Sequence, residues 1–369
     1  MVRKDIVMNT IYPSLEINLK HIEENTKVVV SKCEEQGIHI TGVFKGASGM
    51  PEIAKAMING GCKSMASSRL VQLEKAREYG LNCEMYLIRI PMLTEVKDTI
   101  RLADVSLNSE ITVIEALNEE AIKVNKTHGI ILMADIGDLR EGFWDYDELI
   151  SVAKHIENDL KGLVLKGVGT NIGCYGSVAA TYEKLNELVN ISKRVEDAIG
   201  RKLEIVSGGA TSSLLRIWDK HMPKGINHLR IGEGILLARD LDVFYGADMH
   251  ELHQDAFRLK AEVIEVKNKP THPIGELAVD AFGHTPTYTD RGIRKRALLG
   301  IGKVDYADPK ELIVLEDGLE IIGASSDHTI IDIENVKRDI KVGDIIEFGV
   351  NYATLVFLTY SDNVHIKFI

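Results

Sequence analysis

The sequence predicts a (β/α)8 barrel of the TIM type followed by an all-β domain. Over the first two thirds of the chain, short apolar runs alternate with longer amphipathic runs, as in βαβ units with parallel strands. After about residue 245 only short strand-like runs remain, divided by Gly, Pro, Asn and Asp, and no helix is expected there. We therefore expect residues 10–243 to form the barrel and residues 244–369 the β domain, to which residues 1–9 could add a segment.

The barrel elements follow one another in strict alternation. The predicted strands are Ile38–Phe44, Lys63–Ala66, Cys83–Ile90, Val105–Leu107, Gly129–Ala134, Leu163–Gly169, Leu203–Ser207 and His228–Ile231. The predicted helices are His21–Gln36, Pro51–Ile58, Arg69–Tyr79, Glu95–Ala103, Ile111–Thr127, Tyr146–Ile156, Ala179–Ile199 and Ser212–Trp218. Gly37 and Gly80 mark two helix ends. A further strand, Ser14–Leu19, precedes the barrel.

The β domain is predicted from short runs that alternate with period two or end at turn residues. They are FRLKAEVIEVKN, GELAVDAFGHTPTYTD, KRALLGIGKVDYAD, ELIVLE, LEIIGAS, HTIIDIEN, GDIIEFG and TLVFLTY. Such a series is typical of a compact barrel or sandwich.

Composition and charge narrow the class of partner. The chain has 369 residues, 44 basic and 55 acidic, for a net charge of −11, which argues against nucleic acid or an anionic membrane as the main partner. Its four cysteines show no paired spacing, so we expect free thiols in a reducing compartment. The N-terminus lacks the apolar core of a signal peptide, and no apolar run is long enough to span a membrane. A cytoplasmic protein is the expectation.

Candidate functional groups gather where barrel strands end, the place where barrel enzymes carry their chemistry. They are Lys45 after the first strand, residues 135–140 (DIGDLR) after the fifth, residues 170–173 (TNIG) after the sixth, residues 207–211 (SGGAT) after the seventh and residues 230–234 (RIGEG) at the eighth. Lys45 could be a Schiff-base lysine, whose amine condenses with an aldehyde cofactor, or a surface residue that follows a strand.

Two of these loops are candidate anion sites. SGGATS leads into a predicted helix, so hydroxyls and free backbone N–H groups could face one anion, although the same residues could simply cap that helix. Gly232 and Gly234 would allow a second loop to bring its backbone close to the same point. Two such loops on successive strands favour phosphate.

Together these strand ends resemble those of the alanine racemase-like, fold-type III pyridoxal-phosphate enzymes, and most of all the ornithine racemase branch. The resemblance runs from YPSLEINLKHIEENT to NYATLVFLTY, with DAFGHTP, GIRKRALLGIG and SSDH pointing to the branch. It implies amino-acid racemisation with pyridoxal 5'-phosphate in a head-to-tail homodimer, in which the β domain of one chain completes the other's site. It implies no metal.

The resemblance also implies residue roles. Lys45 would hold the cofactor and act as one of two proton-transfer bases, and Arg140 would lie near the cofactor phenolic oxygen and the substrate carboxylate. Asn171 falls where relatives place a histidine against the cofactor ring. The implied phosphate contacts are Ser207, Thr211, Gly232, the backbone N–H of Glu233, and Tyr360.

Arg230 resembles the arginine that faces the pyridine nitrogen, although a strand-end arginine in a salt bridge is the simpler alternative. A guanidinium stays protonated and cannot hand over its proton. It would therefore donate a hydrogen bond and leave the ring nitrogen unprotonated, which favours a short-lived carbanion and hence racemisation.

Three positions depart from the family pattern. Phe282 replaces the tyrosine that usually serves as the second base, so His284, with its pKa near neutrality, or Tyr288 would take over. Gly49 replaces a tyrosine that contacts phosphate. Met133 replaces a lysine found behind the arginine, so Asp135 or Asp138 would offset the charge of Arg140.

The substrate expected from branch resemblance is ornithine, with alanine, lysine or a broad range as alternatives. A distal ammonium requires a carboxylate or carbonyl groups. Asp327 with Ser326 is the first candidate, and Asp280, Asp305 and Glu141 are others. An aldolase or lyase of the same fold is a rival, but no metal-ligand spacing accompanies Asp327 and His328. A non-catalytic pyridoxal-phosphate-binding protein is a further rival, disfavoured by the complete β domain.

Overall fold

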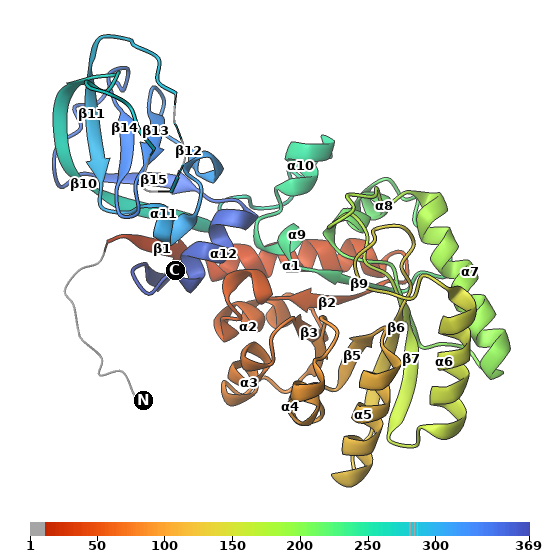
Figure 1. Ribbon diagram of the computed structural model, residues 1–369. Helices are drawn as coiled ribbons and strands as arrows, with labels where there is room; N and C mark the ends of the chain where they lie inside the picture. Colours follow the sequence, from red (N-terminus) through yellow and green to blue (C-terminus); the bar gives the residue numbers. More distant parts are fainter. Residues whose placement is uncertain (1–11, 280–281, 284, 286) are drawn as a thin grey trace. The chain divides into compact units, whose positions relative to one another are not determined.

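The chain forms two compact units in the computed structural model, which describes residues 12–369 except 280, 281, 284 and 286 (Figure 1). One unit is Leu19–Gln254, and the other consists of residues 12–18 with Asp255–Ile369. The border falls later than the expected one at residue 243, because residues 246–254 pack back on the first helix of the barrel. Asn25 donates from Nδ2 to the His253 carbonyl (2.8 Å) and accepts from the His253 N–H (2.7 Å).

The first unit is the predicted barrel, which the structure confirms. Eight parallel strands close in the order β2 to β9, and β9 pairs with β2. The strands are β2 (His39–Val43), β3 (Ser64–Ser67), β4 (Glu84–Leu87), β5 (Val105–Asn108), β6 (His128–Met133), β7 (Leu163–Gly169), β8 (Ile205–Ser207) and β9 (His228–Ile231).

Helices surround these strands (Figure 1). They are α1 (Leu19–Glu34), α2 (Pro51–Asn59), α3 (Leu70–Glu78), α4 (Val96–Leu102), α5 (Ile111–Lys123), α6 (Tyr146–Asp159), α7 (Tyr182–Ile199), α8 (Leu215–Trp218), α9 (Glu233–Leu236) and α10 (Asp240–Tyr245), with single 3-10 turns η1 (Lys45–Ala47), η2 (Leu93–Glu95) and η3 (Thr211–Leu214). No helix in the described part of the chain combines the length and the hydropathy that crossing a bilayer would require.

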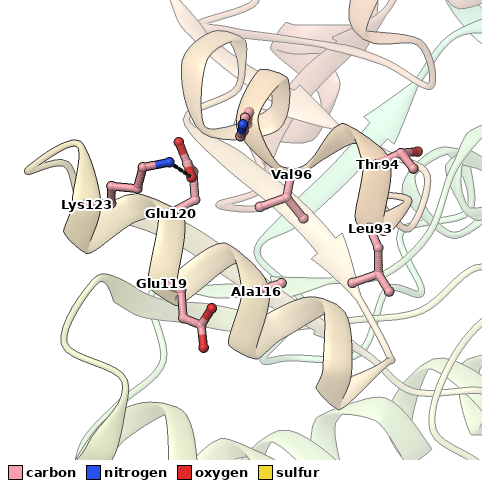
Figure 2. Close-up of a pocket in the computed structure, with 8 residues that line it drawn as sticks. Leu93, Thr94, Val96, Ala116, Glu119, Glu120 and Lys123 are labelled. Atoms are coloured by element: carbon pink, nitrogen blue, oxygen red, sulfur yellow. Dashed lines mark hydrogen bonds and ion pairs between the residues drawn. The ribbon is translucent and has the colours of Figure 1, made fainter.

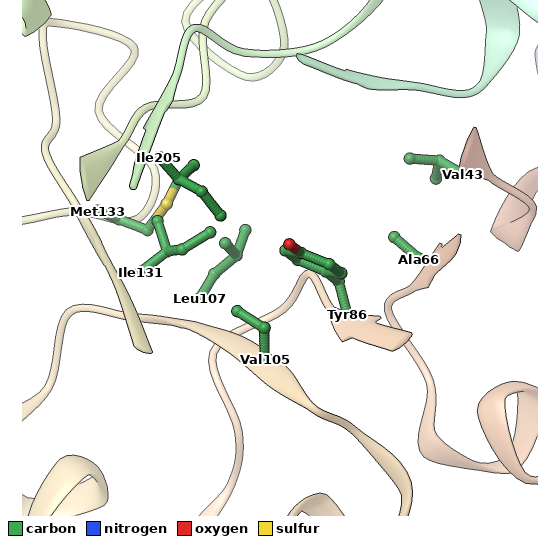
Figure 3. Packing of buried hydrophobic residues seen from close by; sticks show 8 residues of the cluster. All are labelled: Val43, Ala66, Tyr86, Val105, Leu107, Ile131, Met133 and Ile205. Carbon is green, nitrogen blue, oxygen red and sulfur yellow. The ribbon is translucent and has the colours of Figure 1, made fainter. Parts of the chain in front are cut away.

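The barrel interior contains an apolar cluster and a set of buried polar side chains. The apolar cluster consists of Val43, Ala66, Tyr86, Val105, Leu107, Ile131, Met133 and Ile205. Figure 3 shows the Tyr86 ring pointing from β4 into this interior, between Leu107 on one side and Ala66 on the other. Burying each large aliphatic side chain here stabilises the barrel by about 1.5–3 kcal/mol. The buried polar side chains come from strands β2, β3, β8 and β9, three of which also contribute to the apolar cluster, and they position the candidate site.

The second unit is the predicted β domain. Its eight-stranded sheet runs in the order β12-β15-β10-β11-β14-β13, with β1 beside β10 and β16 beside β1. The strands are β1 (Ser14–Ile17), β10 (Phe257–Pro270), β11 (Ile293–Leu299), β12 (Ile313–Val314), β13 (Glu320–Ala324), β14 (Thr329–Asp332), β15 (Ile345–Gly349) and β16 (His365–Phe368). The strand that precedes the barrel in sequence, β1, thus belongs to this sheet. Residues 12–18 were expected in the barrel, but they belong to the β unit.

The prediction that this unit lacks helices is wrong. TLVFLTY lies in α12 (Tyr352–Tyr360), and KVDY forms the single turn α11 (Lys303–Tyr306). A capping box begins α12, because the Asn351 side chain accepts from the Thr354 N–H (3.0 Å) and the Thr354 hydroxyl accepts from the Asn351 N–H (2.9 Å). Leu355 and Leu358, three residues apart, are fully buried on one face. Packing and capping therefore outweigh the β propensity of this run.

A second expected strand is also missing. The described residues of the segment GELAVDAFGHTPTYTD, namely 275–279, 282, 283, 285 and 287–290, form no strand. The segment joins β10 to β11 as a connection that exposes several of its apolar side chains, among them Leu277 and Val279.

A methyl group at Gly167 should disrupt the barrel. This residue pairs with Ile131 of β6 and Ile205 of β8, and a Cβ added to it would lie 1.9 Å from the Ile205 carbonyl oxygen. We expect Gly167→Ala to lower the free energy of unfolding by about 3 kcal/mol. Both tryptophans, Trp144 and Trp218, lie in the barrel unit, so urea denaturation followed by tryptophan fluorescence reports on this unit.

Gly323→Ala in β13 is the matched control, because a Cβ there meets nothing within 4 Å. It should leave the fluorescence transition unchanged. A Gly167→Ala protein as stable as the parent would contradict the close approach of β7 and β8.

Candidate active site at the carboxyl ends of the barrel strands

Lys45 lies two residues after β2, as the first residue of the 3-10 turn η1. Ser48 and Gly49 both take positive φ angles, so the chain turns sharply just after the lysine. The Lys45 side chain is partly buried, and burial lowers its pKa, followed by the positive charge of Arg140. Burial thus increases the fraction of Lys45 present as the free amine, which is the nucleophilic form.

Gly49 leaves no room for the larger side chain that relatives of the predicted family carry. A Cβ on Gly49 would lie 2.4 Å from Cβ and Cγ of Gln72. Gln72 itself is buried and its side-chain oxygen accepts a hydrogen bond from the Ser67 hydroxyl. The glutamine of α3 therefore fills the space beside residue 49.

Arg140 is brought toward the same point by two loops that bind each other. The Asp138 carboxylate accepts from the backbone N–H groups of Cys174 (3.3 Å) and Tyr175 (3.1 Å). Arg140 donates from Nη1 to the Cys174 sulfur (3.1 Å). Arg140 and Cys174 both affect the pKa of Lys45, which places all three groups in one electrostatic neighbourhood.

The acid that pairs with Arg140 is Glu141, whose two carboxylate oxygens accept from Nε and Nη2 of the guanidinium. The sequence predicts that Asp135 or Asp138 offsets the charge of Arg140, and the charge of Asp138 does act on Arg140. Asp135 instead binds the backbone N–H groups of Gly137 (2.8 Å) and Leu139 (3.1 Å), and Asp138 acts on Arg140 only through its charge. Glu141, proposed from sequence as a contact for the substrate ammonium, is thus already paired.

Arg230 is buried among the polar side chains of the barrel interior, with no carboxylate among its recorded partners in the described chain. It donates from Nη1 to the Ser207 hydroxyl (2.5 Å) and from Nη2 to the Thr170 carbonyl (2.8 Å). Burial lowers its pKa to about 10, so it remains a cation at neutral pH. The salt bridge considered from sequence is therefore not what holds Arg230.

Ser207 and His228 complete the environment of Arg230. The Ser207 hydroxyl was expected in the phosphate loop, but it contacts Arg230 and lies 2.8 Å from Nδ1 of His228. Sequence reasoning missed His228. The signal was present, since His228 and Arg230 are two apart on one strand and so share a face.

The two glycine loops are joined by hydrogen bonds, among them one from the Arg230 N–H to the Gly209 carbonyl (3.0 Å). The Gly234 N–H donates to the Thr211 hydroxyl (3.0 Å), and a Cβ on Gly234 would lie 3.1 Å from Cγ2 of Thr211. Gly232 caps α9, and a Cβ there would lie 3.1 Å from the Val43 carbonyl oxygen. The structure therefore brings the loop of Thr211 close to the loop of Gly232, Glu233 and Gly234, at glycines where a Cβ would approach neighbouring atoms within 3.1 Å.

Glu233 offers only its backbone to this loop. Its side-chain Oε1 accepts from the N–H groups of Arg239 (3.0 Å) and Asp240 (3.1 Å), at the start of α10. Burial, with the negative charge of Asp240 second, raises the pKa of Glu233 to about 7.

Asn171 follows β7 with a side-chain nitrogen, Nδ2, that is buried and has no hydrogen-bond partner. An unpaired buried donor is costly in a folded protein. At the end of a barrel strand, such a donor is available to a ligand.

The remaining predicted residues belong to the β unit. Tyr288 contacts His272 edge to face, and the Lys303 ammonium lies 4.3 Å from the centre of the Phe282 ring. Asp327 and Tyr360 are exposed. The Ser326 carbonyl accepts from the Val304 N–H (3.1 Å).

Asp305 is not available to a substrate ammonium. Its buried carboxylate accepts from the Ser361 hydroxyl (2.7 Å), the Asn363 side-chain amide (3.1 Å) and the Gly302 N–H (3.2 Å). Two further candidates, Asp280 and His284, lie outside the described residues.

A groove of about 500 Å³ lies elsewhere, on the helical layer between η2, α4 and α5 (Figure 2). Its lining consists of Leu93, Thr94, Val96, Lys97, Ala116, Glu119, Glu120 and Lys123. None of these residues follows a barrel strand directly, and Glu120 is paired with Lys123 (3.0 Å). The groove is therefore separate from the candidate site.

Comparison with known proteins gives one family. The model of the alanine racemase N-terminal domain matches residues 17–240. The chain is 40% identical over 345 residues to the ornithine racemase of Acetoanaerobium sticklandii, covering 94% of this chain and 96% of that protein. It is 38% identical over 346 residues to the lysine racemase of Thermotoga maritima, covering 94% and 95%.

Solved structures share the fold at much lower identity. An alanine racemase from D-cycloserine-producing Streptomyces lavendulae superposes with a TM-score of 0.75 at 16% identity, covering 96% of both chains. A D-threonine aldolase from Filomicrobium marinum superposes with a TM-score of 0.71 at 14% identity, covering 94% of this chain and 89% of that one. At these identities the likeness concerns the fold alone.

Removing the Glu141 carboxylate should lower the pKa of Lys45 further. Glu141 raises that pKa, whereas Arg140 and Arg230 lower it, so Glu141→Gln leaves the two guanidinium charges less opposed. The measurement is a pH titration of lysines methylated with 13C-formaldehyde, followed by NMR. The signal of Lys45 is assigned by its loss in Lys45→Arg.

Glu119→Gln on α5 is the control for loss of one negative charge outside the site. It should leave the Lys45 titration where it is. A Lys45 pKa that is unchanged or raised in Glu141→Gln would contradict the electrostatic coupling described above.

Proposed function

Because this chain belongs to the alanine racemase family, we propose that it is a pyridoxal 5'-phosphate-dependent racemase that interconverts the enantiomers of ornithine. The enzyme class, an amino-acid racemase, follows from the two relatives that match nearly the whole chain. One observation carries the proposal. Lys45 is partly buried after the first barrel strand, and burial together with the charges of Arg140 and Arg230 lowers its pKa.

The residues present fit the cofactor. Thr211, Gly232 and the N–H of Glu233 would hold its phosphate. Glycine is needed at 232 and 234 because a Cβ there would crowd the neighbouring atoms. Asn171 would present its unpaired Nδ2 to the cofactor, and Arg230 would donate to the ring nitrogen. When bound, pyridoxal phosphate supplies an aldehyde for an amine and a conjugated ring that takes up the electron pair released at Cα.

Lys45 carries the chemistry that the chain itself contributes. As a free amine it would bind the cofactor aldehyde and take or return the Cα proton on one face. Burial lowers the pKa of Lys45, which raises the fraction of the free amine at any given pH. Arg140 would bind the substrate carboxylate, and its pairing with Glu141 would fix its position.

The constant charge of Arg230 favours racemisation over other outcomes. Its pKa of about 10 keeps it protonated, so at neutral pH it donates a hydrogen bond without giving up the proton. The ring nitrogen would stay unprotonated and would stabilise negative charge poorly. Rapid return of a proton to Cα would follow.

The second proton-transfer group and the ammonium contact remain proposals from sequence. His284 or Tyr288 would serve the opposite face of Cα, since the phenyl ring of Phe282 carries no proton. Asp327 with Ser326 is kept as the contact for the distal ammonium, because Asp327 is exposed and Asp305 is fully engaged.

A homodimer is proposed so that these β-unit residues complete the site of a second chain. The loops around Arg140 support it, because they expose the apolar side chains of Leu139, Trp144 and Tyr175. We also propose a cytoplasmic location, which the four free cysteines favour. Lysine is the second candidate substrate, supported by the relative from Thermotoga maritima.

Replacing Lys45 should remove both cofactor attachment and activity. Borohydride reduction of the protein with its cofactor should add the cofactor mass to the peptide that contains Lys45, as detected by mass spectrometry. In Lys45→Arg the adduct should be absent and racemisation should fall by about 10²–10⁴-fold, since arginine cannot act as a base. An adduct that persists on another lysine would overturn the role of Lys45.

Purified protein supplied with pyridoxal phosphate should racemise L-ornithine in preference to L-lysine and L-alanine. The assay follows both enantiomers by chiral chromatography, with exchange of the Cα hydrogen for deuterium measured in parallel in D2O. Preference for lysine or alanine would move the assignment to that substrate. Cofactor binding without exchange of any amino acid would refute the racemase proposal.

A further inference from the structure

A chain of buried hydrogen bonds runs through the barrel interior from Arg230. Nη1 of Arg230 donates to Ser207 Oγ (2.5 Å), which lies 2.8 Å from Nδ1 of His228. Nε2 of His228 lies 2.7 Å from Thr41 Oγ1, and that oxygen lies 2.7 Å from Ser64 Oγ. All five side chains belong to residues that are at most 9% exposed, and they connect strands β9, β8, β2 and β3.

The direction of these hydrogen bonds follows from the donor at one end. A guanidinium only donates, so Ser207 Oγ accepts from Arg230 and must place its own proton elsewhere. Within the described part of the chain, Nδ1 of His228 is the acceptor recorded within reach of that proton. Nδ1 must then be unprotonated, so the ring proton lies on Nε2 and is donated to Thr41.

Electrostatics supports a neutral ring. Burial and the charge of Arg230 lower the pKa of His228 to about 3, so the imidazole is uncharged throughout the neutral range. The Tyr86 ring stacks against it with centroids 5.8 Å apart and restricts its rotation. With the ring neutral, the direction set by the Arg230 donor selects the tautomer with its proton on Nε2.

We propose that His228, with its proton on Nε2, is a positioning residue for Arg230. Its Nδ1 accepts a hydrogen bond from the Ser207 hydroxyl, so a lone pair of the Ser207 oxygen faces the guanidinium and accepts from it. Arg230, which has no carboxylate partner recorded in the described chain, is thereby held by a serine oxygen and the Thr170 carbonyl. The consequence for the cofactor rests on the proposed function, in which this guanidinium donates to the ring nitrogen.

The matched pair His228→Asn and His228→Leu isolates the acceptor. The two side chains have nearly the same shape and both lose the ring, but only asparagine offers an oxygen to the Ser207 proton. We expect the leucine variant to bind pyridoxal phosphate about tenfold more weakly than the asparagine variant, since it leaves a charged hydrogen-bond network incomplete. Its kcat should fall with little change in the KM for the amino acid.

His128 supplies the control for a purely structural histidine. It is buried, with Nε2 lying 2.7 Å from the Ser106 hydroxyl, but its strand position turns it away from the barrel interior and no arginine joins the pair. His128→Asn and His128→Leu should differ in stability and should bind the cofactor equally well.

The tautomer of His228 is measured directly on the full-length parent protein, with and without cofactor. In 15N spectra of histidine-labelled protein, with the signals assigned by their loss in His228→Asn, we expect protonated Nε2 and unprotonated Nδ1 across neutral pH. A proton on Nδ1 would overturn the proposal, whether or not the leucine variant folds.

Equal cofactor affinity and equal kcat in His228→Asn and His228→Leu would likewise overturn it. Failure of the parent protein to bind pyridoxal phosphate would instead refute the proposed function. The tautomer would still decide the role of His228.

Discussion

The structure depends on how one cation, Arg230, is buried inside the barrel. A guanidinium taken from water without a carboxylate requires strong acceptors. Here they are the Ser207 hydroxyl and the Thr170 carbonyl, contributed by the ends of neighbouring strands. The strands that supply them also carry a chain of hydroxyl and imidazole groups inside the barrel. This polar chain lies beside the apolar cluster and ends at Arg230.

Three cationic side chains, Lys45, Arg140 and Arg230, converge electrostatically on one point, and Glu141 is the carboxylate that opposes them most directly. Burial, and after it the charge of Arg140, lowers the pKa of Lys45 and so favours the free amine. The glycine loops 207–211 and 230–234 add backbone N–H groups. Like the three cationic side chains, these groups favour a ligand that carries negative charge. An anionic cofactor and an amino-acid carboxylate are what such a site suits.

Within the β unit, some of the candidate substrate-binding side chains are engaged in hydrogen bonds to the same unit. Asp305 shows this most clearly. Its carboxylate accepts hydrogen bonds from Ser361 and Gly302, so it is not available to bind a substrate ammonium. Asp327 and Tyr360, by contrast, are exposed. The proposed substrate rests on the two racemase relatives, while the barrel residues carry the proposed chemistry.

Local pattern alone determined the barrel, its strand ends and the candidacy of Lys45, Arg140 and Arg230, because strand and helix periods are written in neighbouring residues. It failed where distant residues decide the outcome. TLVFLTY has strand composition, but Asn351 caps it and its buried leucines lie on one helical face. The bonds of Ser207 to Arg230 and His228 could not be read from the sequence, because they form across the barrel. Glu141 pairs with Arg140, and Gln72 fills the space beside Gly49, because only closure of the fold sets which side chains share a volume.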